Sequence, residues 1–72
     1  MNILEVTDLG LAIREARKKQ NLTQEDLAGL TGTGRRFIVE IENGKKTAQL
    51  GKVLNVLKSL GISIHLHYTW DR

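Results

Sequence analysis

The chain has 72 residues, which is enough for one domain but leaves a small core that gains much from a partner. It contains no cysteine, so disulfides and thiolate metal sites are excluded. No apolar run approaches the ~20 residues of a membrane helix, and the first ten residues are unlike a signal peptide, so we expect a cytoplasmic protein. The formal charge is +3, carried largely by the pairs Lys18-Lys19, Arg35-Arg36 and Lys45-Lys46, and this bias favours polyanionic partners.

The N-terminal third of the chain predicts one amphipathic helix. Residues 1–6 are mildly apolar and fit either an extended arm or a frayed end. Thr7 is the expected N-cap of the helix, Asp8 adds negative charge to its first turn, and Asn21 is expected to end it. The buried face is predicted from apolar residues spaced i, i+3, i+4, i+7, namely Leu9, Ala12, Ile13 and Ala16.

A second, short helix follows residues 23–26, which read Thr-Gln-Glu-Asp and form a capping-box pattern. Glycines at positions 32 and 34 predict that this helix ends near Thr31. Gly29 lies inside it and costs up to ~1 kcal/mol relative to alanine. Its apolar face is expected to consist of Leu27, Ala28 and Leu30.

Two further helices are predicted before residue 62. The third begins at Gly34 or Arg35 and stops at Asn43-Gly44, where one of these two residues is expected to be left-handed. The fourth is expected to have Thr47 as its N-cap candidate and Gly61 as its C-cap. The third helix presents Phe37, Ile38 and Ile41 at helical spacing, and the fourth presents Leu50, Val53, Leu54, Leu57 and Leu60.

After residue 61 the apolar period changes from 3.6 to 2, which predicts a strand over residues 62–70. A lone strand needs a neighbour for its backbone groups. The N-terminal arm of the same chain is one candidate, but we favour the same strand of a second copy, antiparallel across a two-fold axis. The sequence therefore predicts a homodimer, with residues 62–72 as a dimerisation strand and tail that includes Ile62, Ile64 and Leu66.

Residues 23–43 supply the three parts of a helix-turn-helix: a bracing helix, a tight glycine-containing turn and a second helix that enters the major groove of DNA. Ala28 is small where the two helices approach each other. Ile38 and Ile41 can fix the second helix in the core while Arg35 and Arg36 point outward. This arrangement favours a DNA-binding function.

The same residues carry a family resemblance. LTQEDLA, a short turn and RRFIVEIENGK resemble the helix-turn-helix class shared by phage repressors and xenobiotic-response-type regulators. GTGRRFI followed by LKSLGISIHLH is similar to the Hip-type antitoxins. The resemblance implies a mainly α, lambda-repressor-like domain of four to five helices over residues 1–61. It also implies a dimeric, autoregulating repressor that binds a palindromic operator in double-stranded DNA and pairs with a serine/threonine kinase toxin.

The resemblance further implies roles for individual residues. Arg35 and Arg36 occupy base-reading positions, where arginine bidentate to guanine is the commonest specific contact. Glu40, one turn further along, would accept from a cytosine amine or orient an arginine. Arg17 and Glu42 match a structural ion pair between the first and third helices. Contacts to the DNA backbone are expected from Gln24, Thr33, Lys45 and Lys46.

Other features have simpler interpretations. His65 and His67 place two imidazoles on one strand face, but without a third ligand we read them as a polar face and expect no metal. Trp70 is either a closing core residue or an exposed anchor for a partner. No nucleophile stands in a pattern with a histidine and an acid, so we expect neither an enzyme nor a cofactor. A phage-type repressor without a toxin, and an interaction module that keeps the helix-turn-helix as a scaffold, are the alternatives.

Overall fold

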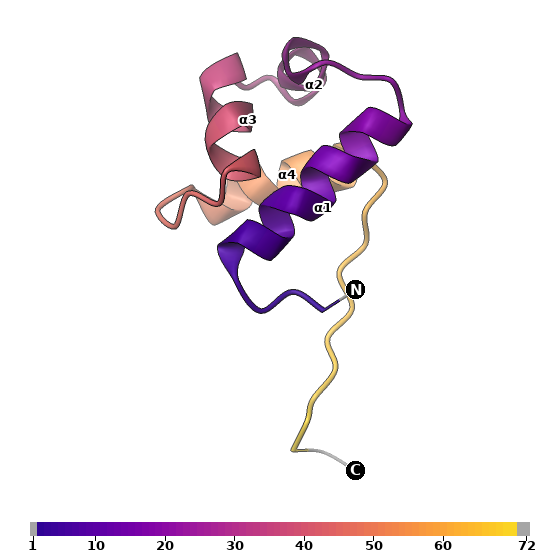
Figure 1. Cartoon of the computed structure of the whole chain (residues 1–72), viewed down its shortest axis with the longest axis vertical. Helices are drawn as coiled ribbons and strands as arrows, with labels where there is room; N and C mark the ends of the chain where they lie inside the picture. Colours follow the sequence, from indigo (N-terminus) through magenta and orange to yellow (C-terminus); the bar gives the residue numbers. More distant parts are fainter. Residues whose placement is uncertain (1, 71–72) are drawn as a thin grey trace.

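The computed structural model describes residues 2–70 and contains four helices followed by an extended C-terminal segment (Figure 1). The helices are α1 (Val6–Lys19), α2 (Gln24–Thr31), α3 (Arg35–Glu42) and α4 (Leu50–Ser59). The fold is therefore mainly α, as predicted, with four helices and no strand among residues 2–70. None of these helices is long and apolar enough to cross a membrane.

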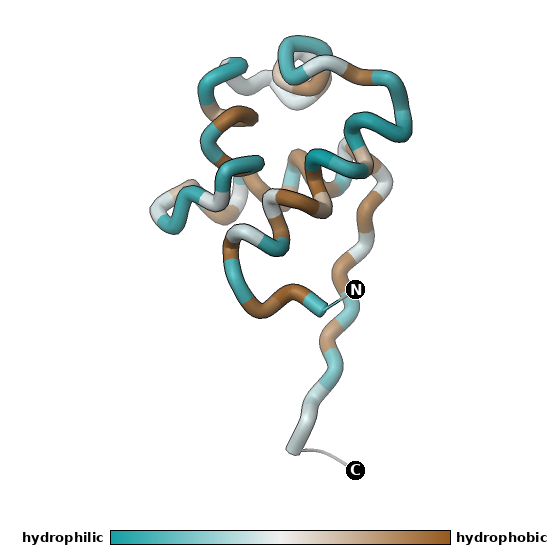
Figure 2. Tube along the Cα trace, in the orientation of Figure 1, coloured by the Kyte–Doolittle hydropathy of each residue, from teal (hydrophilic) through white to brown (hydrophobic). Residues whose placement is uncertain are grey.

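All four helices contribute buried residues to one core, and hydrophobic positions recur along the helices in Figure 2. Ile13, Leu27, Ile38 and Val56 are fully buried and come from α1, α2, α3 and α4 respectively. Burying such a side chain stabilises the fold by roughly 1.5–3 kcal/mol relative to leaving it in water. The remaining core residues are Ala28, Ile41, Val53, Leu57 and Leu60.

Some residues expected on buried faces lie in solvent instead. Leu30 on α2 is 63% exposed, because its helix has only two turns and buries just Leu27 and Ala28. Leu50 and Leu54 are also exposed, since they lie on the side of α4 that turns away from the core residue Val56. The fourth helix thus keeps apolar surface that its own chain does not cover.

Two N-caps differ from the prediction. Glu5, not Thr7, precedes α1, because the Asp8 carboxylate accepts from the backbone N–H groups of Leu4 and Glu5 at 3.1 and 3.0 Å and closes the helix end there. Gln49 precedes α4 in place of Thr47. Ala48 packs against the core, and Gln49 is extended with a φ of −65° and a ψ of 120°, so the helix begins only at Leu50.

α1 and α3 approach each other at a glycine that the sequence patterns did not single out. Gly10 is buried, and a Cβ there would lie 2.5 Å from the carbonyl oxygen of Glu42 and 2.6 Å from that of Ile41. The two backbones are therefore in contact where α3 ends. Gly44 follows with a φ of 81°, which confirms the left-handed residue predicted at this stop.

The segment after α4 leaves the helical body. Gly61 has a φ of 76°, and the Ile62 N–H donates to the Leu57 carbonyl at 2.9 Å, so the end of α4 is closed. Residues 62–68 are extended, and their apolar and polar residues alternate along the chain (Figure 2). Within residues 2–70 no backbone hydrogen bond joins this segment to the N-terminal arm, so the strand is not completed inside one chain.

Candidate nucleic-acid interface

α3 has one face in the core and one in solvent. Ile38 is fully buried and Ile41 is 5% exposed, so the helix is anchored by its inner face. Arg35 and Arg36 open the helix on the outer side, and both are exposed. The Arg36 side chain is 91% accessible. An anchored helix with two accessible guanidinium groups at its N-terminal end has the form of a DNA-reading helix.

The turn before α3 is held by hydrogen bonds. Gly32 is left-handed, with a φ of 69°, and the Thr33 N–H donates to the Ala28 carbonyl at 3.0 Å. The hydroxyls of Thr31 and Thr33 lie 2.9 Å apart, and Asn55 on α4 donates to the Thr31 carbonyl at 3.1 Å. Thr33 is half-buried, so its side chain is partly accessible beside the start of α3.

The N-terminus of α2 is closed by a capping box, as predicted. Thr23 Oγ1 accepts from the Asp26 N–H at 3.0 Å, and Asp26 Oδ2 accepts from the Thr23 N–H at 2.9 Å. The hydrogen bonds from the Thr23 backbone and side chain hold the pKa of Asp26 below its usual 3.8. This start position places Gln24 at the first residue of the helix.

A buried ion pair connects three helices. Glu42 on α3, whose side chain is 3% exposed, accepts from Arg17 Nε at 2.7 Å and from Arg17 Nη2 at 3.1 Å. Arg17 Nη1 donates to the Leu22 carbonyl at 2.8 Å, and Gln24 Nε2 donates to Glu42 Oε1 at 3.2 Å. Gln24 thus has one amide hydrogen fixed by the protein. Its other amide hydrogen remains available for a phosphate oxygen.

The basic residues after α3 lie in the loop that projects beside the C-terminal end of this helix in Figure 1. Lys45 Nζ donates to Glu40 Oε2 at 3.2 Å, and Arg36 Nε lies 3.6 Å from the same oxygen. Lys46 is exposed. The structure thus brings Arg36, Glu40 and Lys45 together along the outer side of α3.

The remaining candidate residues lie in the C-terminal segment. His65 and His67 are exposed, and residues 2–70 contain no cluster of three or more side chains suited to a metal. Trp70 is 78% exposed, and its ring centroid lies 4.8 Å from that of Tyr68. In the single chain Trp70 is therefore no part of the core.

Sequence patterns did not indicate the polar side chains that fasten the helices to one another. Asn55 holds the turn before α3, and Gln20 Nε2 donates to the Leu60 carbonyl at 2.9 Å, joining the end of α1 to the end of α4. Both have amide side chains, and both lie at positions where the amphipathic pattern predicts a solvent-exposed residue. Nothing in the hydrophobic spacing distinguishes them from ordinary solvated residues.

The arrangement of a capped α2, a glycine turn and an anchored α3 defines a helix-turn-helix protein, and comparison with known proteins agrees. A sequence profile described as helix-turn-helix matches residues 13–66, which is most of the chain. An uncharacterized HTH-type transcriptional regulator, y4mF, from Sinorhizobium fredii is 58% identical over 59 residues, covering 82% of this chain and 78% of that protein. The chain belongs to the helix-turn-helix family of transcriptional regulators.

Other relatives narrow the comparison within this family. The ImmF control region 10 kDa protein of Bacillus phage phi105 is 31% identical over 80 residues, which is 97% of this chain and 89% of that protein. Among solved structures, a HipA-HipB-O2-O3 complex has a chain that matches with a TM-score of 0.86 and 29% identity, over 96% of this chain and 97% of its own length. A HipB-O4 20mer complex matches with the same TM-score and 28% identity, over the same shares. The fold is therefore that of HipB.

Proposed function

We propose that the protein is a sequence-specific transcriptional repressor that binds a palindromic operator as a dimer. The observation that carries this proposal is the exposed Arg35-Arg36 pair on a helix whose opposite face is buried. In this proposal both guanidinium groups read guanine in the major groove, each contributing about 1–3 kcal/mol of discrimination. Gln24, Thr33, Lys45 and Lys46 contact the DNA backbone and position the helix. We also propose that the protein and its operator are located in the cytoplasm.

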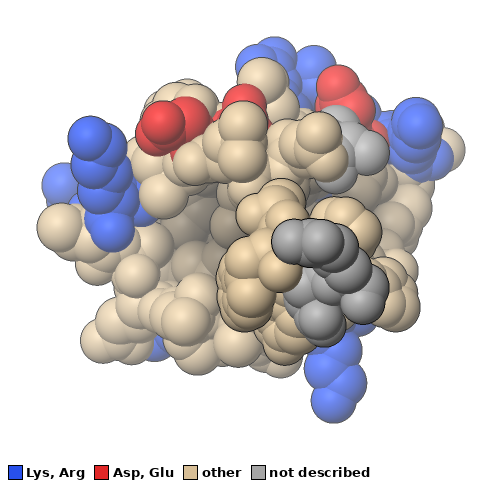
Figure 3. Space-filling model, turned by 90° about the horizontal axis from the view of Figure 1, so that it is seen from below, with Lys and Arg blue, Asp and Glu red and all other residues tan. Residues whose placement is uncertain are grey.

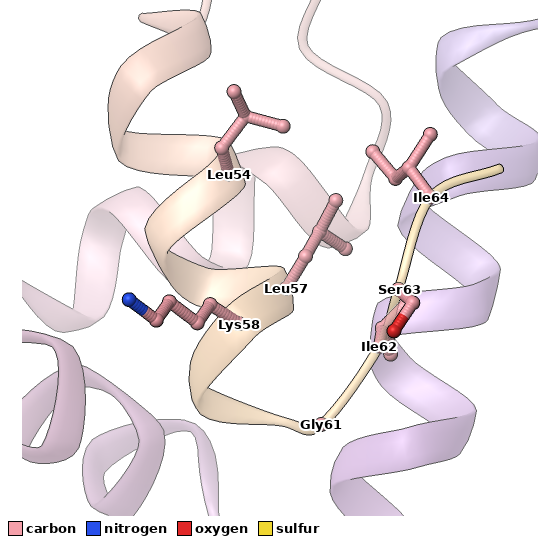
Figure 4. A pocket seen from close by; sticks show the side chains of 7 residues that line it. All are labelled: Leu54, Leu57, Lys58, Gly61, Ile62, Ser63 and Ile64. Atoms are coloured by element: carbon pink, nitrogen blue, oxygen red, sulfur yellow. The ribbon is translucent and has the colours of Figure 1, made fainter. Parts of the chain in front are cut away.

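The dimer is proposed to form through the C-terminal segment. Ile64 and Leu66 are exposed, and Leu54 and Leu57 of α4 line a hollow of about 290 Å³ together with Ile62 and Ile64 (Figure 4). Seen from below in Figure 3, the surface outside the undescribed grey atoms is mostly uncharged, with lysine and arginine at its edge and acidic side chains along its upper part. Pairing two such segments satisfies their backbone groups and covers apolar surface. Two recognition helices then lie about 34 Å apart, one turn of DNA.

The likeness to HipB, found in a complex with HipA, supports a further step. We propose that the protein is the antitoxin of a Hip-type kinase and represses its own operon. The exposed Trp70 is the proposed anchor for this partner, because single aromatic residues often dominate interface energetics. A phage-type repressor without a toxin is the second candidate, favoured by the 31% identity to the phi105 control-region protein. Co-purification with the product of a neighbouring kinase gene decides between them.

The base-reading proposal is tested with Arg35→Ala combined with Arg36→Ala. A duplex selected from a random pool by the unmodified protein is compared with a scrambled duplex. We expect the preference for the selected duplex to fall by at least about tenfold, because both guanine contacts are lost. Arg14→Ala combined with Lys18→Ala removes the same charge from exposed positions of α1 and is expected to keep the preference. An unchanged preference in the first variant would refute groove reading and favour an interaction module.

The dimer is tested by deleting every residue after Gly61 and measuring the mass in solution by sedimentation equilibrium. The helical body retains its core in this variant, because the buried cluster ends at Leu60. We expect a folded monomer that binds one half-site weakly. A truncated chain that still sediments as a dimer would place the interface elsewhere.

A further inference from the structure

Glu40 is a carboxylate on the outer side of α3, between the proposed base reader and a proposed phosphate contact. Its Oε2 accepts from Lys45 Nζ at 3.2 Å and lies 3.6 Å from Arg36 Nε. Its side chain is 30% exposed, against 91% for Arg36 and 44% for Lys45. One oxygen therefore touches two cations that have different proposed tasks.

The backbone strengthens this link. The Glu40 carbonyl accepts from the Lys45 N–H at 3.0 Å and from the Asn43 N–H at 3.2 Å, which closes the turn after α3. Lys45 is thus held to Glu40 through both its main chain and its side chain. The position of the Lys45 ammonium relative to α3 is set by Glu40, while Lys46 extends from the same loop without an ion pair among residues 2–70.

We propose that Glu40 is a positioning residue that raises DNA specificity by acting on Arg36 and Lys45 rather than by touching a base. This inference rests on the proposed repressor function, and it identifies Glu40 as a residue that adjusts DNA affinity within that site.

The chemistry of a guanidinium group gives the first part of the effect. Arginine presents five N–H donors in a rigid fork. With the Nε side directed at Glu40, the Nη1 and Nη2 edge remains for the O6 and N7 acceptors of guanine. Glu40 therefore favours one orientation of Arg36 before DNA binds. A preordered side chain loses less conformational entropy on binding its correct base.

Charge gives the second part. Affinity for DNA of any sequence depends on how many phosphates the basic side chains neutralise. Glu40 partly neutralises the charge that Lys45 brings to its proposed phosphate contact and adds a negative charge to the surface that faces DNA, so it lowers affinity for every sequence. On the correct operator, the ordered Arg36 contact offsets this loss. The result is a larger ratio of specific to non-specific affinity.

The test uses Glu40→Gln in the full chain, with the duplex selected from a random pool and its scrambled counterpart as probes. We expect affinity for the scrambled duplex to rise several-fold and the specificity ratio to fall about three- to tenfold. The dependence of log affinity on log salt for the scrambled duplex should steepen by up to about one unit, since Lys45 then neutralises its phosphate without a competing carboxylate. Glu15→Gln makes the same charge change on an exposed position of α1 and should leave the ratio unchanged.

A double-mutant cycle separates positioning from other roles. In an Arg36→Ala background, Glu40→Gln should no longer reduce the specificity ratio, although the steeper salt dependence should persist through Lys45. A changed base preference at an operator position other than the one that Arg36→Ala alters would show that Glu40 reads a base and would overturn the inference. An unchanged ratio in Glu40→Gln overturns it as well. A protein that prefers no sequence before any substitution refutes the repressor proposal itself.

Discussion

The helical body, residues 6–60, and the C-terminal segment, residues 62–70, use apolar residues with equal regularity but end in different states. The helices bury most of their apolar residues within the chain, although Leu30 and Leu50 are exposed, whereas in the segment Leu66 remains 77% exposed. The difference follows from hydrogen bonding. A helix satisfies its backbone groups within itself, while an extended segment needs a neighbouring strand. One chain therefore suffices to complete the first region, and we propose that two chains complete the second.

The largest effect is expected from breaking the body at its buried ion pair. Glu42→Ala leaves the Arg17 guanidinium buried beside no carboxylate, which should lower the free energy of unfolding by about 3–5 kcal/mol. Urea denaturation measures this loss, and Glu15→Ala on exposed α1 serves as the control, expected within about 0.5 kcal/mol. A loss below 1 kcal/mol in Glu42→Ala would mean that Arg17 finds another partner.

Substitutions in the C-terminal segment should weaken the dimer without unfolding the helical body. Replacing both Ile64 and Leu66 by serine removes apolar area from each protomer and should raise the dimer dissociation constant about a hundredfold or more. The helical circular dichroism of the monomer should stay unchanged, because neither side chain belongs to the core. His65→Ser lies on the alternate face of the segment, outside the hollow lined by Ile62 and Ile64, and is the control. Equal dissociation constants for the serine variant and its parent would contradict the proposed interface.

Two glycines of the helical body should respond differently to replacement by alanine. Gly10→Ala places a Cβ against two α3 carbonyl oxygens and should cost about 1–3 kcal/mol, because neither backbone can move without disturbing the core. Gly29→Ala meets nothing within 4 Å and should stabilise α2 by up to ~1 kcal/mol. Thermal unfolding of the two variants should shift in opposite directions. Destabilisation by both would show that helix propensity does not control the result at Gly29.

The smallest effect concerns Asp26. Because hydrogen bonds from Thr23 lower its pKa in the folded state, the unfolded chain binds more protons here as the solution is acidified. The stabilisation is therefore fully present above the usual pKa of 3.8 and is lost as pH falls through the lowered value. Asp26→Asn should remove this acid-side dependence. Comparing urea midpoints of the two proteins between about pH 5 and 2 tests it, and parallel curves would contradict it.

Local sequence rules predicted the centre of the molecule well. The capping box at Thr23, the end of α2 at Thr31 and the stop at Gly44 all depend on neighbouring residues and are present. Burial of Ile38 and Ile41 also follows from their spacing. The residues that carry the proposed DNA contacts lie on these elements, so their outward placement could be expected from the sequence.

Features that depend on distant residues were harder to predict. Nothing local to Gly10 reports that the end of α3 passes over it. The contact between Glu40 and Lys45 likewise spans a turn whose geometry only the fold defines. Such details need tertiary structure because their causes lie on other elements.

The close approach at Gly10 has a consequence for how this protein can change over generations. Main-chain atoms, with no intervening side chain, set the distance between α1 and the end of α3. The angle at which α3 is presented therefore does not depend on the identity of its outward residues. With Arg35 and Arg36 in their proposed base-reading role, substitutions at these two positions would alter the recognised operator while the scaffold stays in place. A lineage of such proteins can thus acquire new target sites without rebuilding the domain that carries them.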